Sequence, residues 1–421
     1  MTTPHSTQQF SCTIIGGGIH GTYLAQRLIE DAPLEREDVC IVDPHEKLLT
    51  SFREKANACG MDALRSTFVH HIGTEPFGLE SFAEANGRAD ELVPTVDYPP
   101  RPSLELFLDY AAYVIDRKDL ESVHRQTLVE DIYERSGKTG FRLETTTGPI
   151  ETDHCVLAIG NGGRQRWPDW AIDLDGVDHV WDEFDPDASA NRTLVVGGGI
   201  TAAQLAIEMS ETQSVGLLTR HPLTWEVSEA EPPWINWSHV EANLHSYPPG
   251  SSERFEVAVD ARNTATIPPY LYSEFEDRIE TGSLTLAQGT VESATVADGT
   301  VQLTLDHGLG LLGDRVVLAT GFEPVFDHPF VERIADELEL ARGYRGMPIL
   351  DDDSLAWQRK DSEALPLYVT GALALGTVGP YAANIPGARR AGDRISDAVT
   401  RSLHSRTEAT SESVRATEVS D

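Results

Sequence analysis

The sequence predicts an α/β protein in which a doubly wound, parallel-sheet domain occurs twice, with the second copy inserted into the first. Two observations support this fold class. A glycine-rich turn between an apolar strand and a helical pattern occurs at residues 16–21 and again at 197–202. Each turn is followed by short alternating segments that predict a β-meander and end in kindred sequences, at 156–160 and 317–321. The chain has 421 residues, enough for two or three domains.

The first copy starts with the apolar run of residues 10–15, followed by the turn and a helical pattern over 22–29. A second apolar run, 38–43, ends in an acid and completes a strand–helix–strand unit. Alternating segments then predict three antiparallel strands at 127–134, 141–147 and 150–159.

The second copy has the same order, with a strand at 192–196, a helix ending near Met209 and a strand at 214–220. Its meander is expected over 284–288, 291–296, 301–305 and 314–320, and a closing helix over 386–403. The domain boundaries follow from these segments. They give a flexible N-terminal arm (1–9), a discontinuous first domain (10–190 plus 315–403), an inserted domain (191–314) and a disordered acidic tail (404–421).

The first turn has the G-x-G-x-x-G spacing of a Rossmann-like dinucleotide-binding domain. The first glycine permits a tight turn, the second lets a pyrophosphate approach the backbone, and the third lets the helix pack closely on the strand. The phosphates then meet the N–H groups at the helix N-terminus. An acid at the end of the next strand accepts hydrogen bonds from a ribose diol. These roles fall on Gly16, Gly18, Gly21 and Asp43 and predict an FAD site, although glycine turns also occur for structural reasons alone.

The second turn differs in two positions. Gly197 and Gly199 repeat the pattern, but Ala202 replaces the third glycine, and Arg220 stands where the first copy has an acid. A guanidinium can bind a 2′-phosphate through two parallel hydrogen bonds, whereas an acid would repel it. The second domain is therefore expected to bind NADP. The alternative is that Arg220 is only surface charge.

Two later glycines are expected beside the flavin ring. Thr320 and Gly321 lie where the chain returns from the inserted domain. Gly371 begins the stretch that leads to Asn384 and the closing helix, whose N-terminus would stabilise negative charge on a reduced ring. The alternative is that these glycines only turn the chain.

Composition limits the partners and the setting. The chain has 33 Lys and Arg against 68 Asp and Glu, a net charge of −35. Because molar salt reduces the Debye length to about 3 Å, such a surface predicts a halophilic, cytoplasmic protein. The same charge argues against nucleic acid and membranes as partners. The four cysteines form no CxxC pair, and no metal site is expected.

The motifs GGGIHG, GGGITA, LATGFEP and YVTGALALGTVGP, in this order, resemble the flavoprotein monooxygenases with two dinucleotide domains. Within that group the chain is most similar to the siderophore-type enzymes that hydroxylate the side-chain amine of lysine or ornithine. The resemblance covers about residues 10 to 400. It implies that Met61 and Arg65 belong to the flavin-adjacent stretch, with helix packing and a surface ion pair as the alternative. The family's Thr-Asn-Tyr stretch reads Thr264-Ala265-Thr266 here, which leaves the substrate open.

The activity that the resemblance implies is oxygen transfer. NADPH would reduce FAD, O2 would form a C4a-hydroperoxyflavin, and a small amine would be hydroxylated. No catalytic side chain is expected, because the flavin carries the chemistry. Two other functions stay open: an NAD(P)H-dependent flavin reductase or electron-transfer flavoprotein without a dithiol, and a non-catalytic NADPH sensor. Self-association into a homo-oligomer stays open as well.

Overall fold

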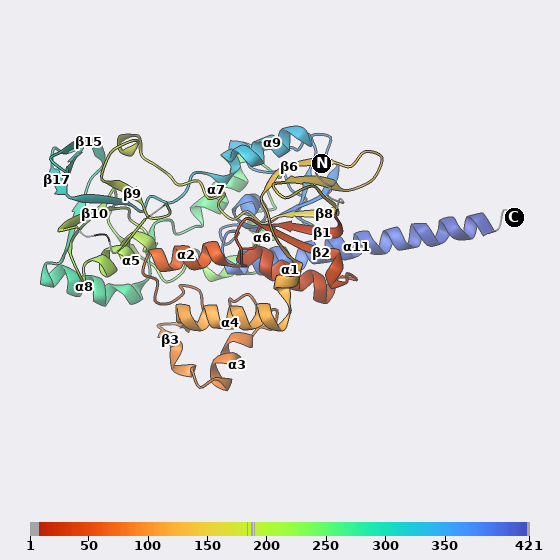
Figure 1. Cartoon of the computed structure of the whole chain (residues 1–421), viewed down its shortest axis with the longest axis horizontal. Helices are drawn as coiled ribbons and strands as arrows, with labels where there is room; N and C mark the ends of the chain where they lie inside the picture. Colours follow the sequence, from red (N-terminus) through yellow and green to blue (C-terminus); the bar gives the residue numbers. More distant parts are fainter. Residues whose placement is uncertain (1–7, 183, 187, 189, 419–421) are drawn as a thin grey trace, which may run out of the picture.

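The structure is a computed structural model that describes residues 8–418 except 183, 187 and 189, with side chains as far as Ser405. Two parallel sheets lie at opposite ends of the body (Figure 1). The sheet built from the two ends of the chain forms the first unit, and the sheet built from its middle forms the second unit. The mixed α/β fold with parallel sheets confirms the predicted fold class.

The sheet of the first unit has β1 and β8 at its centre. Its strands run parallel except β19, which is antiparallel to β20, and the β6–β7 pair, which joins β8 as an antiparallel meander. The meander confirms the one predicted for this copy. In spatial order the strands are β19 (Ala356–Gln358), β20 (Ala364–Val369), β8 (Ile150–Leu157), β1 (Gln8–Ile15), β2 (Val39–Asp43) and β5 (His124–Gln126), with β6 (Val129–Glu134) and β7 (Phe141–Thr145) beside β8.

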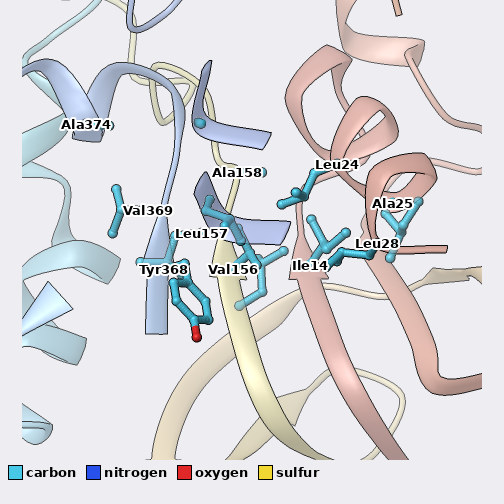
Figure 2. Packing of buried hydrophobic residues seen from close by; sticks show 14 of the residues in the cluster. Ile14, Leu24, Ala25, Leu28, Val156, Leu157, Ala158, Tyr368, Val369 and Ala374 are labelled. Atoms are coloured by element: carbon cyan, nitrogen blue, oxygen red, sulfur yellow. The ribbon is translucent and has the colours of Figure 1, made fainter. Parts of the chain in front are cut away.

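Helices cover this sheet and bury its apolar residues. Figure 2 shows Leu24 and Leu28 of α1 beside Ile14 of β1 and Val156 of β8. All four side chains are buried, because α1 packs on the central strands of the sheet and excludes water there. The helices of the first unit are α1 (Ile19–Asp31), α2 (Thr50–Ala58), α3 (Gly78–Ala85), α4 (Leu104–Arg117), α9 (Pro329–Glu337), α10 (Leu375–Val378) and α11 (Ile385–Glu418), and a hairpin of β3 (Leu92–Thr95) and β4 (Tyr98–Pro102) precedes α4.

The sheet of the second unit has five parallel strands with an apolar cluster on each face. A separate three-stranded antiparallel meander packs against it. The strands are β14 (Leu284–Gln288), β11 (Ser214–Thr219), β10 (Arg192–Val196), β18 (Arg315–Leu318) and β9 (Val177–His179), and the meander is β15 (Val291–Ala297), β16 (Thr300–Leu305) and β17 (Gly310–Gly313). The helices on this sheet are α5 (Ile200–Met209) and α8 (Tyr272–Thr281), with a short parallel pair of β12 (Thr224–Trp225) and β13 (Thr266–Ile267). α6 (Trp237–Asn243) and α7 (Ser252–Asp260) come from the same stretch of chain but pack against the first unit, where Arg254 of α7 donates to Asp352.

Strand pairing corrects the predicted domain boundaries. We expected the inserted domain to span 191–314, which leaves β9 and β18 in the first domain. Both strands belong to the second sheet, where β18 pairs with β10 and with β9. β14 likewise pairs with β11 in that sheet rather than joining the meander, which uses β17 instead. We therefore propose that the inserted unit begins before Val177 and ends after Leu318.

The two ends of the chain also differ from expectation. β1 begins at Gln8, so part of the expected flexible arm (1–9) is a strand, and residues 1–7 lie outside the described residues. α11 continues to Glu418, although we expected a disordered tail from residue 404. The physical reason is that no Gly or Pro follows Gly392 to end the helix. Its far end extends away from the body (Figure 1), and residues 419–421 lie outside the described residues.

Within the described part of the chain, no helix has the length and apolar character needed to cross a lipid bilayer.

Candidate dinucleotide-binding sites

The turn between β1 and α1 packs closely against neighbouring backbone at Gly16 and Gly21 and leaves open space at Gly18. A Cβ at Gly16, whose φ is +117°, would lie 2.3 Å from the carbonyl oxygen of Ala158. A Cβ at Gly21 would lie 1.8 Å from the carbonyl oxygen of Gly16. At Gly18, the residue that precedes α1, no atom lies within 4 Å of a Cβ position. Gly16 and Gly21 are therefore closely packed and Gly18 faces open space, and phosphate binding at this turn stays a prediction.

Asp43 lies beside this turn at the end of β2. Its Oδ2 accepts a hydrogen bond of 2.6 Å from the backbone N–H of Gly17, and its Oδ1 accepts one of 2.9 Å from the N–H of His45. These contacts fix the carboxylate next to the start of α1. The Nδ1 of His45 also lies 2.7 Å from Oδ1. A carboxylate has about four lone-pair positions, so capacity for about one further hydrogen bond from a ribose hydroxyl remains.

His20 joins the same turn to the segment that begins at Gly371. Its Nδ1 lies 2.8 Å from the hydroxyl oxygen of Thr370, the residue that follows β20. Burial lowers the pKa of His20 to about 4, and backbone groups of Ala383 and Asn384 oppose the shift only in part. Gly371 has a φ of +75°. The structure therefore brings the 370–384 segment to the first turn, and a contact of Gly371 or Asn384 with a flavin stays a prediction.

The turn between β10 and α5 repeats the backbone plan. A Cβ at Gly197 would lie 2.5 Å from the carbonyl oxygen of Ala319, and Ala202 is completely buried. At Gly199 the nearest atom to a Cβ position is the Cα of Ala265, at 3.6 Å. Ala265 has a φ of +55°, which is uncommon for a residue with a side chain. The 262–266 loop thus covers part of the α5 N-terminus.

Arg220 follows β11 directly and is exposed. Within the part of the chain that the structure describes, its guanidinium forms no ion pair, although 68 acids are present in the sequence. Its position next to the second turn is the one that Asp43 has next to the first, at the end of the second strand of the unit. The side chain is therefore available to a ligand on this turn.

The chain passes between the units through two paired segments. The N–H of Arg166 donates to the carbonyl oxygen of Gly321 over 3.0 Å, and the hydroxyl of Thr320 donates to the carbonyl oxygen of Arg166. The Oγ1 of Thr320 also lies 3.3 Å from Nε2 of His179, whose pKa is lowered to about 4 by burial. Thr320 and Gly321 are therefore part of the connection between the units, and their contact with a cofactor stays a prediction.

Arg65 contacts the second unit. Its guanidinium donates to the carbonyl oxygens of Glu226, at 2.6 Å, and Val227, at 3.0 Å, and to the hydroxyl of Thr266 at 2.9 Å. Met61 is half-buried against the core of the first unit. Arg65 therefore joins the two units, a role that the sequence did not predict, and a role of either residue in flavin binding stays a prediction.

A second set of polar residues crosses the same interface. Arg262 donates to the side-chain oxygen of Asn384 over 3.1 Å, and the Asn384 amide donates to Glu229 over 3.2 Å. The guanidinium carbon of Arg101 lies 3.3 Å from the ring centre of Tyr270.

Burial lowers the pKa of Arg101 and raises that of Tyr270 to about 12. The Nε of Arg101 and the hydroxyl of Tyr270 are buried without a hydrogen-bond partner among the described residues. Sequence reasoning missed Glu229, because its role depends on a contact between units.

The four cysteines are free and buried. Burial raises the pKa of the Cys40 and Cys59 thiols to about 12 and raises those of Cys12 and Cys155 as well. None of these thiols is ionised near neutral pH, and the thiolate is the form that exchanges with disulfides. Among the described residues, no three His, Cys, Asp or Glu side chains form a group that could hold a metal ion.

A cavity of about 980 Å³ lies elsewhere, between β19–β20, α6 and α11. None of the glycine-turn residues lines it. The predicted dinucleotide sites at the two turns are therefore separate from this cavity.

Comparison with known proteins agrees with the fold. Residues 13–162 match a family model described as FAD-NAD(P)-binding. No curated protein sequence matches the chain. The structure is similar to that of ornithine hydroxylase from Pseudomonas aeruginosa, with 18% identity, a TM-score of 0.75 and coverage of 94% of this chain and 100% of that chain.

Two further solved structures have the same arrangement. L-lysine 6-monooxygenase from Pseudomonas syringae is 20% identical, with a TM-score of 0.71 and coverage of 93% of this chain and 99% of that chain. Bacillithiol disulfide reductase from Bacillus cereus is 19% identical, with a TM-score of 0.61 and coverage of 94% and 99%. The chain therefore has the Rossmann-type fold of FAD- and NAD(P)-binding flavoproteins.

Proposed function

We propose that this protein is an FAD-dependent, NADPH-driven monooxygenase that hydroxylates a small amine with O2. The observation that carries the proposal is the pair of glycine turns with opposite charges beside them, Asp43 at the first and Arg220 at the second. The likeness to ornithine hydroxylase and lysine 6-monooxygenase over nearly the whole chain supports it.

The residues of the first turn fit an FAD diphosphate. The open space at Gly18 leaves room for a phosphate against the backbone, and no acid lies in the first turn of α1 to compete for its N–H groups. Asp43 would accept hydrogen bonds from the adenosine ribose, as its place at the end of β2 favours.

The residues of the second turn fit NADPH. The first turn of α5 also lacks acids, and Ala202 leaves the close helix–strand packing intact. The free guanidinium of Arg220 would bind the 2′-phosphate through paired, charge-assisted hydrogen bonds. The 262–266 loop would lie against the bound dinucleotide, since Ala265 already approaches Gly199.

A bound flavin, once reduced by NADPH, supplies the oxygen chemistry that amine hydroxylation needs. The chain's own residues would orient the partners and exclude water. Arg65 and Arg262 hold the loops of the second unit against the first. The buried Arg101 and Tyr270 at this interface offer unpaired donors to a polar group of the substrate.

The test is the fate of O2. FAD-loaded protein, NADPH and air are combined with lysine, ornithine, cadaverine or putrescine, and O2 uptake, hydrogen peroxide and hydroxylated amine are measured. We expect one amine to divert oxygen from peroxide into an N-hydroxylated product. Peroxide alone, in equal amounts with every amine, would contradict amine hydroxylation.

A flavin reductase is the second candidate, because the fold is also similar to that of bacillithiol disulfide reductase. The buried, protonated cysteines oppose disulfide reduction and leave ferredoxin- or quinone-type acceptors. A soluble quinone that accepts electrons about 100 times faster than O2 would favour this candidate. NADPH binding without any NADPH oxidation would favour a sensor instead.

The net charge of −35 supports a cytoplasmic setting at high salt. The repulsion between so many carboxylates falls as salt screens them. A melting temperature that rises steadily from low to molar KCl is expected, and a melting temperature independent of KCl would contradict this setting.

A further inference from the structure

A cavity of about 560 Å³ lies between α3, α4 and the 73–78 segment. The two helices lie at the edge of the first unit (Figure 1). None of the residues of the two glycine turns lines it. Its volume is in the range of small-molecule sites. Its lining includes Gln26, Gly73, Phe77, Phe82, Tyr110 and Tyr113.

Aromatic side chains form the walls. The ring centre of Phe82 lies 5.5 Å from that of Tyr110 and 5.2 Å from that of Tyr113. Phe77 is 58% exposed and Tyr113 is 41% exposed, so this part of the surface presents large apolar rings to water. Such an arrangement gains from a ring or apolar body placed between the side chains.

The Tyr110 hydroxyl lies in space that two glycines leave open. A Cβ at Gly73 would lie 2.3 Å from the Tyr110 hydroxyl oxygen, and a Cβ at Gly78 would lie 2.2 Å from it. Burial raises the pKa of Tyr110 to about 12, so its hydroxyl is neutral. The backbone thus makes room for a polar group inside an aromatic cavity.

Gln26 of α1 supplies the feature that points to a ligand. Its side chain is 1% exposed and lines the cavity. Its Nε2 donates to the carbonyl oxygens of Ile72, at 2.8 Å, and Thr22, at 3.3 Å. Only the NH2 group of the side-chain amide can donate to two carbonyl oxygens. These contacts therefore determine which atom is Nε2 and which is Oε1. Its Oε1 is a buried acceptor without a hydrogen-bond partner among the described residues, which is unfavourable unless a ligand donates to it.

The charges around the cavity disfavour a cation, and the unpaired acceptor of Gln26 disfavours an anion that has no hydrogen to donate. Arg117 and Lys118 line it, and Arg389 donates to the carbonyl oxygen of Gly73 over 2.8 Å from behind the wall. They outnumber Glu75, the carboxylate among the lining residues, and disfavour a cation. A carboxylate or phosphate has no hydrogen to donate to the Oε1 of Gln26.

We propose that this cavity binds a neutral aromatic molecule whose hydroxyl or N–H group donates to the Oε1 of Gln26, with the ring between Phe82, Tyr110 and Tyr113. This site is separate from the proposed catalytic function and does not depend on it.

The test compares 2-naphthol with 2-methylnaphthalene, which has the same ring without a donor, by fluorescence titration of the full FAD-loaded chain. One hydrogen bond to a buried acceptor predicts about ten-fold tighter binding of 2-naphthol. Gln26→Met removes the acceptor and should reduce this preference to less than about two-fold. Equal binding of both probes to the unmodified protein would overturn the proposal.

A second pair of variants keeps the test valid if Gln26→Met does not fold. Ala85 is exposed on α3 and lines the cavity, whereas Glu84 is exposed on the same helix and does not. Ala85→Trp should fill the cavity and abolish 2-naphthol binding, and the matched control Glu84→Trp should leave it unchanged. Binding that survives Ala85→Trp would show that 2-naphthol lies elsewhere and would overturn the proposal.

Discussion

The two glycine turns share one backbone plan and differ in their surroundings. At the first turn, a Cβ at Gly18 would meet no atom within 4 Å, whereas at the second a Cβ at Gly199 would lie 3.6 Å from Ala265. At the third pattern position, a Cβ at Gly21 would lie 1.8 Å from the carbonyl oxygen of Gly16, yet Ala202 is accommodated. In the proposed function, each turn would bind the phosphates, and the residues around it would determine which dinucleotide fits.

A second similarity between the two units is a contact between a threonine and a histidine. Thr370 follows β20 and Thr320 lies just after β18, and the hydroxyl of each contacts a histidine: Thr370 with His20 at 2.8 Å, and Thr320 with His179 at 3.3 Å. His20 comes from the first glycine turn, whereas His179 ends β9. Burial lowers the pKa of both histidines to about 4, so both are neutral at pH 7.

The largest expected effect tests the third position of the turns. Gly21→Ala brings a methyl group against the carbonyl oxygen of Gly16 and should cost about 3 kcal/mol of stability and most of the bound FAD. The matched change in the second turn, Ala202→Gly, should cost only about 1 kcal/mol. Flavin-to-protein absorbance ratios and thermal unfolding measure both. A Gly21→Ala protein with a full complement of FAD would refute the tight packing assigned to the first turn.

The second-largest expected effect tests the charged residue beside the second turn. Arg220→Ala removes the cation assigned to the 2′-phosphate and should raise the KM for NADPH by about 10–100-fold, with little change for NADH. Arg278→Ala is the control, since Arg278 is a surface residue of the same unit that pairs with Glu211. Steady-state oxidation of both nucleotides gives the comparison. Equal losses for NADPH and NADH would remove Arg220 from this role.

The two buried histidines predict a pH dependence of stability. Because burial lowers both pKa values from 6.5 to about 4, the unfolded chain binds more protons than the folded chain between these values. Stability should therefore be complete above pH 6.5 and decrease as the pH falls towards 4, by on the order of 2 kcal/mol for each histidine. Denaturant unfolding from pH 4 to 7 measures the slope. His179→Gln should flatten it, and an unchanged slope in the variant would be the contrary result.

The smallest expected effect concerns the loop over the second turn. Ala265 has a φ of +55°, so Ala265→Gly should relieve a backbone cost of about 1 kcal/mol and raise the melting temperature by about 2 °C. Asp298, with a φ of +50° at the β15–β16 turn, provides a control away from the ligand. Asp298→Gly should give a similar gain. Only Ala265→Gly should also alter NADPH binding; if both variants bind NADPH alike, the loop does not contact the dinucleotide.

Local patterns were enough to predict the strand–turn–helix units, because the residues that define them are adjacent in the chain. The close packing of Gly16 against Ala158 and of Gly21 against Gly16 is what the spacing predicts. β9 was missed because it has only three residues, Val177–His179, and becomes a strand through pairing with β18 far along the chain. The predicted domain boundaries were wrong for the same reason.

The interface between the units could not be predicted from local patterns. The sequence analysis predicted Arg65, by resemblance, and Asn384, from its place before the closing helix, as cofactor ligands, while the structure gives them partners on the opposite unit, Thr266 and Glu229. Hydrophobic periodicity does not predict a contact such as that between Arg65 and Thr266, which are 201 residues apart in the chain. The helix α11 was predicted too short because its polar composition was given more weight than its lack of Gly and Pro.

The central claim is that the two turns hold different dinucleotides and that electrons pass between them. The direct measurement is an anaerobic titration of the purified, FAD-reconstituted protein, followed at the flavin absorbance near 450 nm. The account predicts one FAD per chain, rapid bleaching by NADPH and much slower bleaching by NADH. A protein that takes up no flavin, or a bound flavin that NADPH leaves oxidised, would contradict it.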